Sequence, residues 1–260
     1  MDQAVRLACM SLMWGQLSSA ERMEQWLSDV HAAGYEGVAT FDRCLLALAT
    51  EADFPRRLRE IGLALASVDY KIDRDFDRLR GVCEIMQRLG SQHMVLLGGP
   101  AQKGADMGEI ADLLNEIGEI ALTYGVRAGF HNHTGHTGET MEEVEALLAR
   151  TDPAKVFGFL DVGHATKDFA GHPVERRAAL FLERNWDRID FLEFKDWSET
   201  TDLNTEVGAG RCDYAAVFRI LKDRGYSGWI TVEQNGPTPG KTPLQCATAS
   251  REFIRRGLGV

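Results

Sequence analysis

Eight short apolar segments recur along this chain, and longer segments with helical periodicity separate them. Each apolar segment has four to six residues and lacks the alternation of a half-exposed strand. This pattern is typical of strands buried on both faces of a parallel sheet. The predicted strands are Val5–Met10, Gly37–Phe41, Leu63–Val68, His93–Leu97, Val126–Phe130, Val156–Leu160, Ile189–Phe194 and Trp229–Val232.

The segments between these strands are amphipathic, and several of them end at a glycine shortly before the next strand. Glycine adopts the left-handed conformation that closes a helix at little cost, so this joint is expected between a helix and the following strand. Gly34, Gly90, Gly125 and Gly225 stand at such joints. The predicted helices are Ser19–Ala33, Asp73–Leu89, Asp106–Tyr124, Thr140–Ala149 and Asp213–Arg224.

Repeated strand–helix units favour one architecture for the whole chain. Eight repeats imply a parallel sheet that closes on itself, and a length of 260 residues suits a single α/β barrel. We therefore predict one (β/α)8 TIM barrel domain over residues 1–260, with its site at the C-terminal strand ends. An open doubly wound sheet is the alternative. No GxGxxG or GxxxxGK(S/T) motif follows the first strand, which argues against the nucleotide-binding forms of that alternative.

Composition excludes several kinds of partner. The formal net charge of -10 disfavours both nucleic acid and anionic membranes, and no apolar run is long enough for a membrane span. The N-terminus, with Asp2 before Arg6, does not resemble a signal peptide. The five cysteines are scattered without a CxxC pair, so we expect free thiols and a cytoplasmic protein.

Polar residues follow the last four predicted strands, where a barrel of this kind carries its catalytic groups. Strand five runs into His131-Asn132-His133, and strand six into Asp161 and His164. One imidazole and three carboxylates are a mixed nitrogen and oxygen ligand set for one divalent ion, which would offset the repulsion among buried carboxylates. Mn²⁺, Mg²⁺, Co²⁺, Fe²⁺ and Zn²⁺ all suit this set, with Mn²⁺ favoured. The predicted ligands are His131, Asp161, Glu193 and Glu233.

Other acids and histidines have simpler interpretations. Asp196 and Asp202 are expected to be helix caps or ion-pair partners. His172 is predicted in a surface loop, His31 on a helix surface and His93 at the start of a strand.

Several short motifs carry a family resemblance. They are Asp161-Val162-Gly163-His164, Val207-Gly208-Ala209-Gly210-Arg211, and GYSGWITVE, which ends at Glu233. Together they resemble the xylose-isomerase-like barrel superfamily of sugar isomerases and epimerases. The resemblance covers nearly the whole chain and is strongest from Gly125 to Gly236. Members commonly hold a metal with Glu, Asp, His and Glu on strands five to eight.

This chain departs from the family pattern at two positions. His131 stands where strand five commonly carries Glu, and Glu193 replaces the histidine of the strand-seven motif H-x-K-D. The exchange leaves one histidine and three carboxylates. His133 or Glu139 is the alternative ligand from strand five. The segment from His131 to Gly135 also resembles the H-x-H-M-G segment of inosose dehydratases.

The resemblance implies a divalent-metal-dependent isomerase or epimerase of a sugar, keto-sugar or related polyol, acting through an enediolate. Glu233 is the candidate base. His164 is expected to contact a substrate oxygen or to orient a metal ligand, and His133 and Lys195 are candidates for donating to the substrate oxygen or carrying a proton. A further pair of candidates for binding substrate is Trp14, by stacking, and Arg211. Their alternatives are core or lid packing for Trp14 and a surface salt bridge for Arg211.

Other functions remain as alternatives. A metal-dependent lyase of the dehydratase type comes next, because the loss of the strand-five carboxylate removes one standard base. A metal-free sugar-binding barrel or interaction module is more remote, and the net charge of -10 argues against an abasic-site endonuclease. The expected partner is a small carbohydrate. Phe169, Phe181 and Trp186 indicate either a homo-oligomer, dimer or tetramer, or ordinary helix packing.

Overall fold

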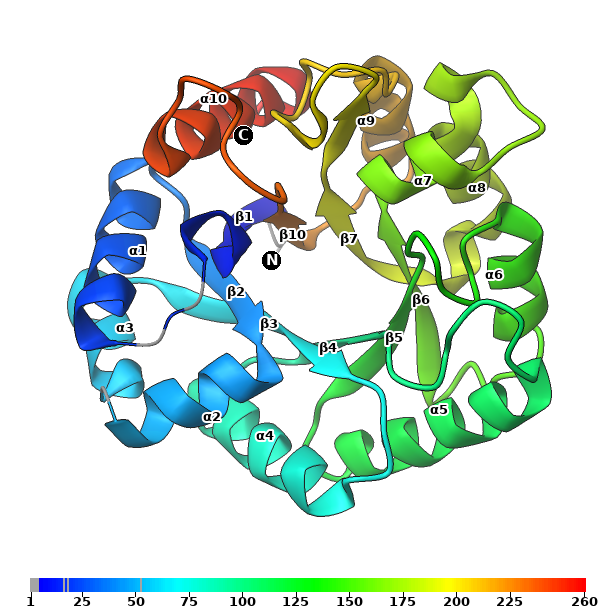
Figure 1. The fold of residues 1–260 in the computed structure, drawn as a ribbon, viewed down its shortest axis with the longest axis horizontal. Helices are drawn as coiled ribbons and strands as arrows, with labels where there is room; N and C mark the ends of the chain where they lie inside the picture. The colour runs from blue at the N-terminus through cyan, green and yellow to red at the C-terminus, as the bar shows by residue number, and fades with distance from the viewer. Residues whose placement is uncertain (1–4, 16, 18, 52) are drawn as a thin grey trace.

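A closed barrel of eight parallel strands forms the centre of the computed structural model, which describes residues 5–15, 17, 19–51 and 53–260 (Figure 1). Around the barrel the strands follow the order β1-β10-β7-β6-β5-β4-β3-β2, and β1 pairs with both β2 and β10. The prediction of a (β/α)8 barrel is therefore confirmed, and the open sheet is excluded. The barrel strands are β1 Val5–Met10, β2 Gly37–Phe41, β3 Ala64–Lys71, β4 His93–Leu97, β5 Arg127–His131, β6 Val156–Asp161, β7 Ile189–Phe194 and β10 Gly228–Val232.

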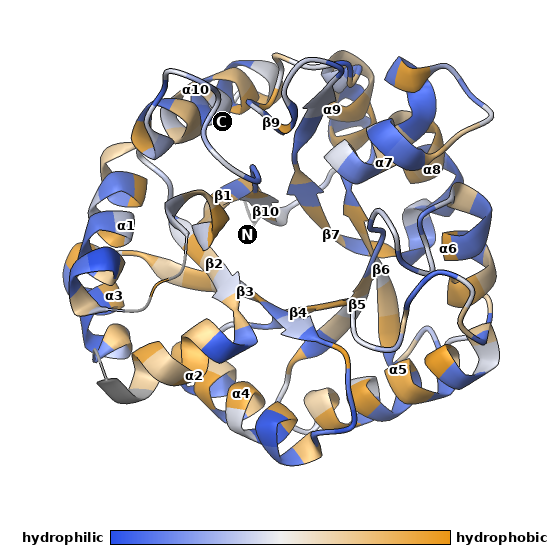
Figure 2. Cartoon of the chain, in the orientation of Figure 1, coloured by the Kyte–Doolittle hydropathy of each residue, from blue (hydrophilic) through white to orange (hydrophobic). Residues whose placement is uncertain are grey.

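Helices surround the strands and turn their apolar faces toward them (Figures 1 and 2). Several begin at a side chain that accepts a backbone N–H, as Thr140 does in the capping box at the start of α6. The helices are α1 Ala20–Ala32, α2 Asp42–Glu51, α3 Phe54–Ile61, α4 Phe76–Leu89, α5 Met107–Leu122, α6 Met141–Leu148, α7 Val162–Asp168, α8 Arg177–Asn185, α9 Tyr214–Asp223 and α10 Pro243–Leu258. Short 3-10 turns are η1 Ser11–Trp14, η2 Val174–Arg176 and η3 Trp186–Arg188.

The structure extends the predicted elements at two places that matter for the site. Strand β3 runs to Lys71, three residues beyond the predicted end at Val68, and so carries Asp69 into the barrel. Helix α7 follows β6 with no loop, because Asp161 ends the strand and also caps the helix by accepting the N–H of His164. A small hairpin of β8 Asp196–Ser198 and β9 Asp202–Thr205 follows β7.

The barrel interior has an aromatic layer beneath a polar one. Phe159 and Phe191 stack with ring centroids 5.4 Å apart inside the barrel. Because successive side chains on a strand point to opposite faces, the residue two positions further along points the same way. Asp161 therefore follows Phe159 on β6, and Glu193 follows Phe191 on β7. The same alternation that fills the core thus aims these carboxylates into the barrel.

The helix-packing interpretation holds for two of the three aromatic residues considered for an oligomer interface. Phe169 and Phe181 are buried within the chain, with ring centroids 5.2 Å apart. Trp186 packs edge-on against Tyr226 at a centroid distance of 6.4 Å.

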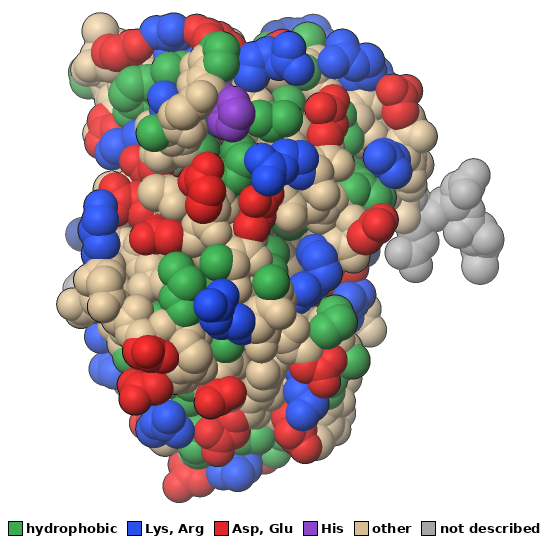
Figure 3. Space-filling view, turned by 90° about the vertical axis from the view of Figure 1, so that its right-hand side faces the viewer, with side chains coloured by type: hydrophobic (Ala, Val, Ile, Leu, Met, Phe, Trp, Pro, Cys, Tyr) green, Lys and Arg blue, Asp and Glu red, His purple; other side chains and the backbone are tan. Residues whose placement is uncertain are grey.

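All five cysteines are free thiols, as expected. Within the described residues, no helix combines the length and apolar character that crossing a membrane requires. On the side of the barrel seen in Figure 3, acidic and basic side chains are interspersed and hydrophobic side chains form small separate groups.

A glycine on β5 makes room for the aromatic layer and supplies a test of this packing. A Cβ at Gly129 would lie 2.3 Å from the ring of Phe157. We expect Gly129→Ala to lower the free energy of unfolding by about 1–3 kcal/mol through overpacking, measured by urea denaturation. The control is Gly81→Ala in α4, where the nearest atom lies 3.8 Å away, so no loss is expected. Equal destabilisation by both substitutions would contradict this account.

Candidate functional site

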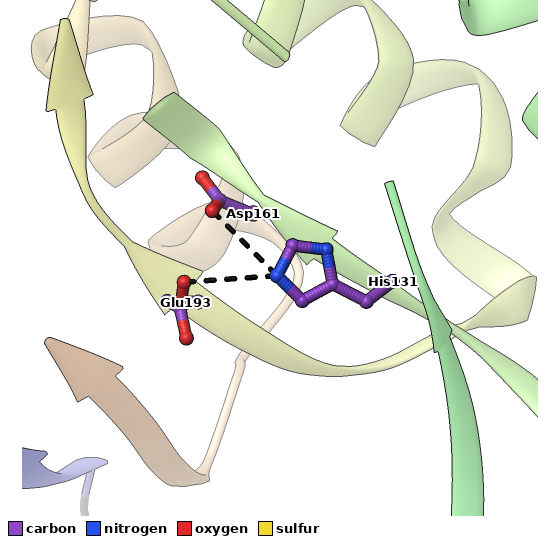
Figure 4. Close-up of side chains that lie close together, drawn as sticks. All are labelled: His131, Asp161 and Glu193. Carbon is purple, nitrogen blue, oxygen red and sulfur yellow. Dashed lines mark ion pairs between the residues drawn. The ribbon is translucent and has the colours of Figure 1, made fainter. Parts of the chain in front are cut away.

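Three buried side chains from neighbouring strands converge at the C-terminal end of the barrel (Figure 4). His131 ends β5, Asp161 ends β6, and Glu193 lies one residue before the end of β7. The Nε2 atom of His131 lies 3.7 Å from Asp161 Oδ2 and 3.9 Å from Glu193 Oε1. One ligand atom from each residue lies within 4.8 Å of the others, so the three could hold a metal ion.

The hydrogen bonds of His131 determine which nitrogen faces the carboxylates. Its Nδ1 lies 2.6 Å from the carbonyl oxygen of Asn132, and a carbonyl can only accept, so the proton is on Nδ1. Burial, together with the charges of its neighbours, holds the pKa of His131 well below its usual range, so the ring is neutral. Nε2 therefore presents a lone pair to Asp161 and Glu193.

The carboxylate oxygens of Asp161 and Glu193 that face His131 accept no hydrogen bond from the described residues. Asp161 Oδ2 and Glu193 Oε1 are buried and have no hydrogen-bond partner among the described residues. Burial raises the pKa of Asp161, and burial with the charges of Glu233 and Asp161 raises the pKa of Glu193 well above its usual range. Three buried acceptor atoms that face one another destabilise the folded protein unless a proton or a cation lies between them. The donor set therefore fits a divalent ion.

Backbone contacts hold this group in place. The side-chain amide of Asn132 donates to the Asp161 carbonyl at 3.0 Å and accepts the Asp161 N–H at 2.9 Å, which ties β5 to β6. Asp161 Oδ1 accepts the N–H of His164 at 2.9 Å. At Gly163, a Cβ would lie 2.8 Å from Lys195 Cβ. The glycine of the D-x-G-H motif thus allows α7 to pack against β7.

A second group of carboxylates shares Glu193. Asp69, Glu193 and Glu233 also place one oxygen each within 4.8 Å of the others. The ammonium of Lys195 donates to Glu233 and lies 3.8 Å from Asp161 Oδ2. Although burial opposes its charge, the carboxylates of Glu233, Asp161 and Glu193 raise the pKa of Lys195. Lys195 thus supplies one positive charge to the second group.

Asp69 is the buried site residue that the sequence did not predict. Its burial and the nearby charge of Glu233 raise its pKa well above the usual range. Asp69 lies two residues after Ser67 on β3, and Ser67 lies 3.3 Å from Thr231 across the barrel. The strand predicted to end at Val68 left Asp69 outside the sheet, and no local sequence signal corrects that end.

The other two histidines of the predicted site contact Thr134. His133 Nδ1 lies 2.8 Å from the Thr134 carbonyl, so its proton is on Nδ1 and its Nε2 is an acceptor. His164 Nδ1 lies 2.9 Å from Thr134 Oγ1 and 3.3 Å from the Thr134 nitrogen, and Thr134 Oγ1 also donates to Asp168. Burial keeps both rings neutral by lowering their pKa values. His164 Nε2 is buried without a hydrogen-bond partner in the described part of the chain and lies 3.8 Å from Asp161 Oδ2.

A cavity of about 290 Å³ opens above these groups. Its polar lining includes four predicted site residues, namely His131, His133, Lys195 and Glu233, together with Asp69 and Asn235. Leu12, Phe41 and Leu97 form its apolar wall.

Three candidates lie apart from this cavity. The indole N–H of Trp14 donates to Asp29 at 2.8 Å, which packs the ring against α1. Arg211 forms ion pairs with Glu175 and Glu199, which matches its salt-bridge alternative. Glu139, the alternative ligand, pairs with Lys103 at 3.0 Å.

Asp196 has a role that differs from the expected cap or ion pair. Its carboxylate accepts four backbone N–H groups, from Trp197, Gly208, Gly210 and Cys212. The Gly208-Ala209-Gly210 motif therefore wraps a buried carboxylate next to Lys195. Asp202 does form the expected ion pair, with Lys167 at 3.0 Å.

The fold and the candidate metal ligands at the ends of the late strands define a TIM barrel with a candidate metal site. The sequence identifies the family. A family model described as xylose isomerase-like TIM barrel matches residues 27–256. The chain belongs to this family.

Curated relatives of this chain are inosose dehydratases. That of Bacillus velezensis is 26% identical over 92% of this chain and 90% of that protein. That of Bacillus licheniformis is 34% identical over 56% of this chain, and this match spans about half of the relative, 52% of its length.

Solved structures share the fold at low sequence identity. An L-ribulose 3-epimerase has a TM-score of 0.74 at 17% identity, covering 98% of this chain and 95% of that one. The IOLI protein, solved with a zinc atom, has a TM-score of 0.74 at 18% identity, covering 98% of each chain.

The raised pKa values of Asp161 and Glu193 predict how metal-free protein responds to pH. A folded state with raised carboxyl pKa values binds protons more tightly than the unfolded chain, so it loses stability as pH rises above about 4. We expect the metal-stripped protein to lose stability relative to its Asp161→Asn variant over that range. Added Mn²⁺ should restore the wild type only. Thermal unfolding at successive pH values measures both effects.

The control for this experiment is Asp77→Asn, because the Asp77 side chain is fully exposed. It should follow the wild type at every pH. If Mn²⁺ stabilises the Asp161→Asn variant as much as the wild type, Asp161 does not contribute to metal binding.

The hydrogen-bond pattern also predicts two tautomers. In ¹⁵N-histidine spectra of the metal-free protein, His131 and His133 should carry the proton on Nδ1. Signals are assigned with single His→Gln variants. An Nε2–H signal for His131 would refute the lone pair inferred to face Asp161 and Glu193.

Proposed function

We propose that this chain is a divalent-metal-dependent enzyme of a sugar or cyclitol ketone, and that it eliminates water from its substrate. One observation carries the proposal: the donor-free group of His131, Asp161 and Glu193 lies beneath a cavity that also presents a charged base–ammonium pair. The sequence placed isomerase first and dehydratase second. The dehydratase match over 92% of this chain supports reversing that order.

We propose that His131, Asp161 and Glu193 hold the ion, with Glu233 beside them. When bound, a divalent ion supplies Lewis-acid polarisation of a substrate carbonyl. The mixed ligand set suits Mn²⁺, Co²⁺, Fe²⁺, Mg²⁺ or Zn²⁺. Among these, Mn²⁺ is our first candidate, and the zinc atom named for the IOLI structure makes Zn²⁺ the second.

Glu233 and Lys195 together balance the protons of an elimination. Glu233 faces the cavity and removes the proton from the carbon beside the carbonyl. Lys195 gives a proton to the departing hydroxyl, which leaves as water while the carbon–carbon double bond forms. Because Lys195 donates directly to Glu233, return of the proton from Glu233 to Lys195 restores both groups.

The two histidines have different tasks in this scheme. The Nε2 of His133, which lines the cavity, accepts from a substrate hydroxyl. His164 orients Asp161, whose backbone-capping carboxylate accepts the His164 N–H and lies 3.8 Å from His164 Nε2. Neutral rings suit these tasks, since burial lowers the pKa of both. His133 is therefore an acceptor here, rather than the donor considered from the sequence.

Isomerisation or epimerisation is the second candidate, and Asp69 favours it. Reaction on both faces of an enediolate needs a second acid–base group. Asp69 lines the cavity from β3, across the barrel from β7, with its oxygen near Glu193 and Glu233. A carboxyl at that position could exchange a proton on the face opposite to Glu233.

Incubation in D₂O tests the proposal and separates the two reactions. The metal-loaded protein is given an inosose and a panel of ketohexoses, and products are followed by NMR and mass spectrometry. We expect a product lighter by one water from the inosose. Deuterium uptake without loss of water would instead establish isomerisation, and no reaction with any ketone would refute both.

Replacement of the proposed base supplies the matched prediction. Glu233→Gln should lower kcat by at least about 100-fold, the contribution typical of general base catalysis, while leaving the fold intact. Glu206→Gln is the control, because Glu206 is also buried and lysine-paired but contacts Lys241 and Thr238 instead. Retained activity in Glu233→Gln would remove Glu233 as the base.

A further inference from the structure

The site cavity does not end above the carboxylates. A second cavity, of about 370 Å³, lies over the ends of β2, β3 and β4. It shares Phe41, Asp69 and Leu97 with the cavity of about 290 Å³ that contains Lys195 and Glu233. The two cavities therefore adjoin at Phe41, Asp69 and Leu97, and we call the second one the outer chamber.

The loop after β4 leaves the outer chamber open. Gly98 and Gly99 have φ angles of 66° and 61°, in the left-handed region, and a Cβ at Gly99 would overlap the carbonyl oxygen of Ile72 at 1.7 Å. The loop can therefore pack closely on the end of β3 only with glycine at that position. Gly98 and Gly99 therefore add no side chain to the space beside Leu97, and Gln102 is the side chain of this loop that lines the chamber.

The walls combine an apolar surface with polar groups that are available for a ligand. Phe41 and Leu97 are half-buried and line both cavities. Gln102 and His136 lie at the polar side, and His136 Nδ1 is buried without a partner in the described residues. An apolar wall with a few placed polar groups is the usual construction of a small-molecule site. It suits the C–H face and the hydroxyls of a sugar ring.

Charge argues against an anionic group in this chamber. Two carboxylates, Asp42 and Asp69, line it, and Lys71 is the one basic residue in its lining. The nearby guanidinium of Arg78 is already paired with Asp42 and Asp73. Because Asp42 and Arg78 neutralise each other, a phosphate would meet the carboxyl of Asp69 and a single exposed lysine, which favours a neutral group.

We propose that the outer chamber binds a second, neutral sugar ring, so that the preferred substrate is a glycosylated keto-sugar or cyclitol rather than a free monosaccharide. This inference rests on the proposed function, because the reacting ring must occupy the inner cavity. The second ring would lie beyond Asp69, between Phe41 and Gln102.

Binding of unreactive probes tests the chamber separately from catalysis. Calorimetric titrations of the Mn²⁺-loaded protein compare myo-inositol with its β-D-glucosyl derivative and its monophosphate. We expect the glucoside to bind at least tenfold more tightly than myo-inositol. Gln102→Trp, which would fill the chamber, should abolish that difference. The control Gln92→Trp places the same side chain at an exposed position before β4, at the other end of the barrel, and should keep it.

The outcomes separate the two proposals. Equal affinities for myo-inositol and its glucoside, tighter binding of the monophosphate, or an unchanged difference in Gln102→Trp would each overturn the outer chamber as a site for a neutral ring. Kinetics with an inosose and its glucoside then test the proposed function. If neither reacts although the glucoside binds more tightly, the proposed reaction fails and the chamber stands.

Discussion

Repulsion among buried acceptors is the constraint on which the rest of this structure depends. Asp69, Asp161, Glu193 and Glu233 lie together at the barrel mouth, with the lone pair of His131 directed at two of them. Lys195 is the only ammonium within this group in the described chain. One positive charge cannot balance four carboxylates, so the folded chain either keeps some of them protonated or recruits a cation. Either state leaves groups at this end of the barrel that can exchange protons.

Much of the fold could be predicted because it rests on local periodicity. Runs such as Ile189–Phe194 can be recognised as buried strands from composition alone, and closure follows from their number. The same strand ends predicted His131, Asp161, Glu193 and Glu233 as a group. Their roles as ligands remain a prediction; the structure groups His131, Asp161 and Glu193, and places Glu233 in a second group that shares Glu193. The prediction was possible because side chains alternate between the two faces of a strand, which directs Asp161 on β6 and Glu193 on β7 into the barrel.

What could not be predicted depends on contacts between distant residues. Asp69 was missed because nothing local marks where β3 ends, and only pairing with β2 and β4 extends it to Lys71. The contacts of His164 Nδ1 come from Thr134, thirty residues earlier in the chain. Asp196 resembled a cap or an ion-pair partner because its four N–H donors come largely from a loop more than ten residues later.

Because no loop separates β6 from α7, the connections on the two sides of the barrel differ in the sequence changes that they tolerate. Asp161 ends the strand, caps the helix and faces His131, so an insertion there would displace a candidate ligand together with His164. The connection after β4 contains none of the candidate ligands, and the close approach of Gly99 to Ile72 fixes its course at the glycine turn. Sequence changes elsewhere in that connection would therefore reshape the outer chamber while the candidate ligands keep their places.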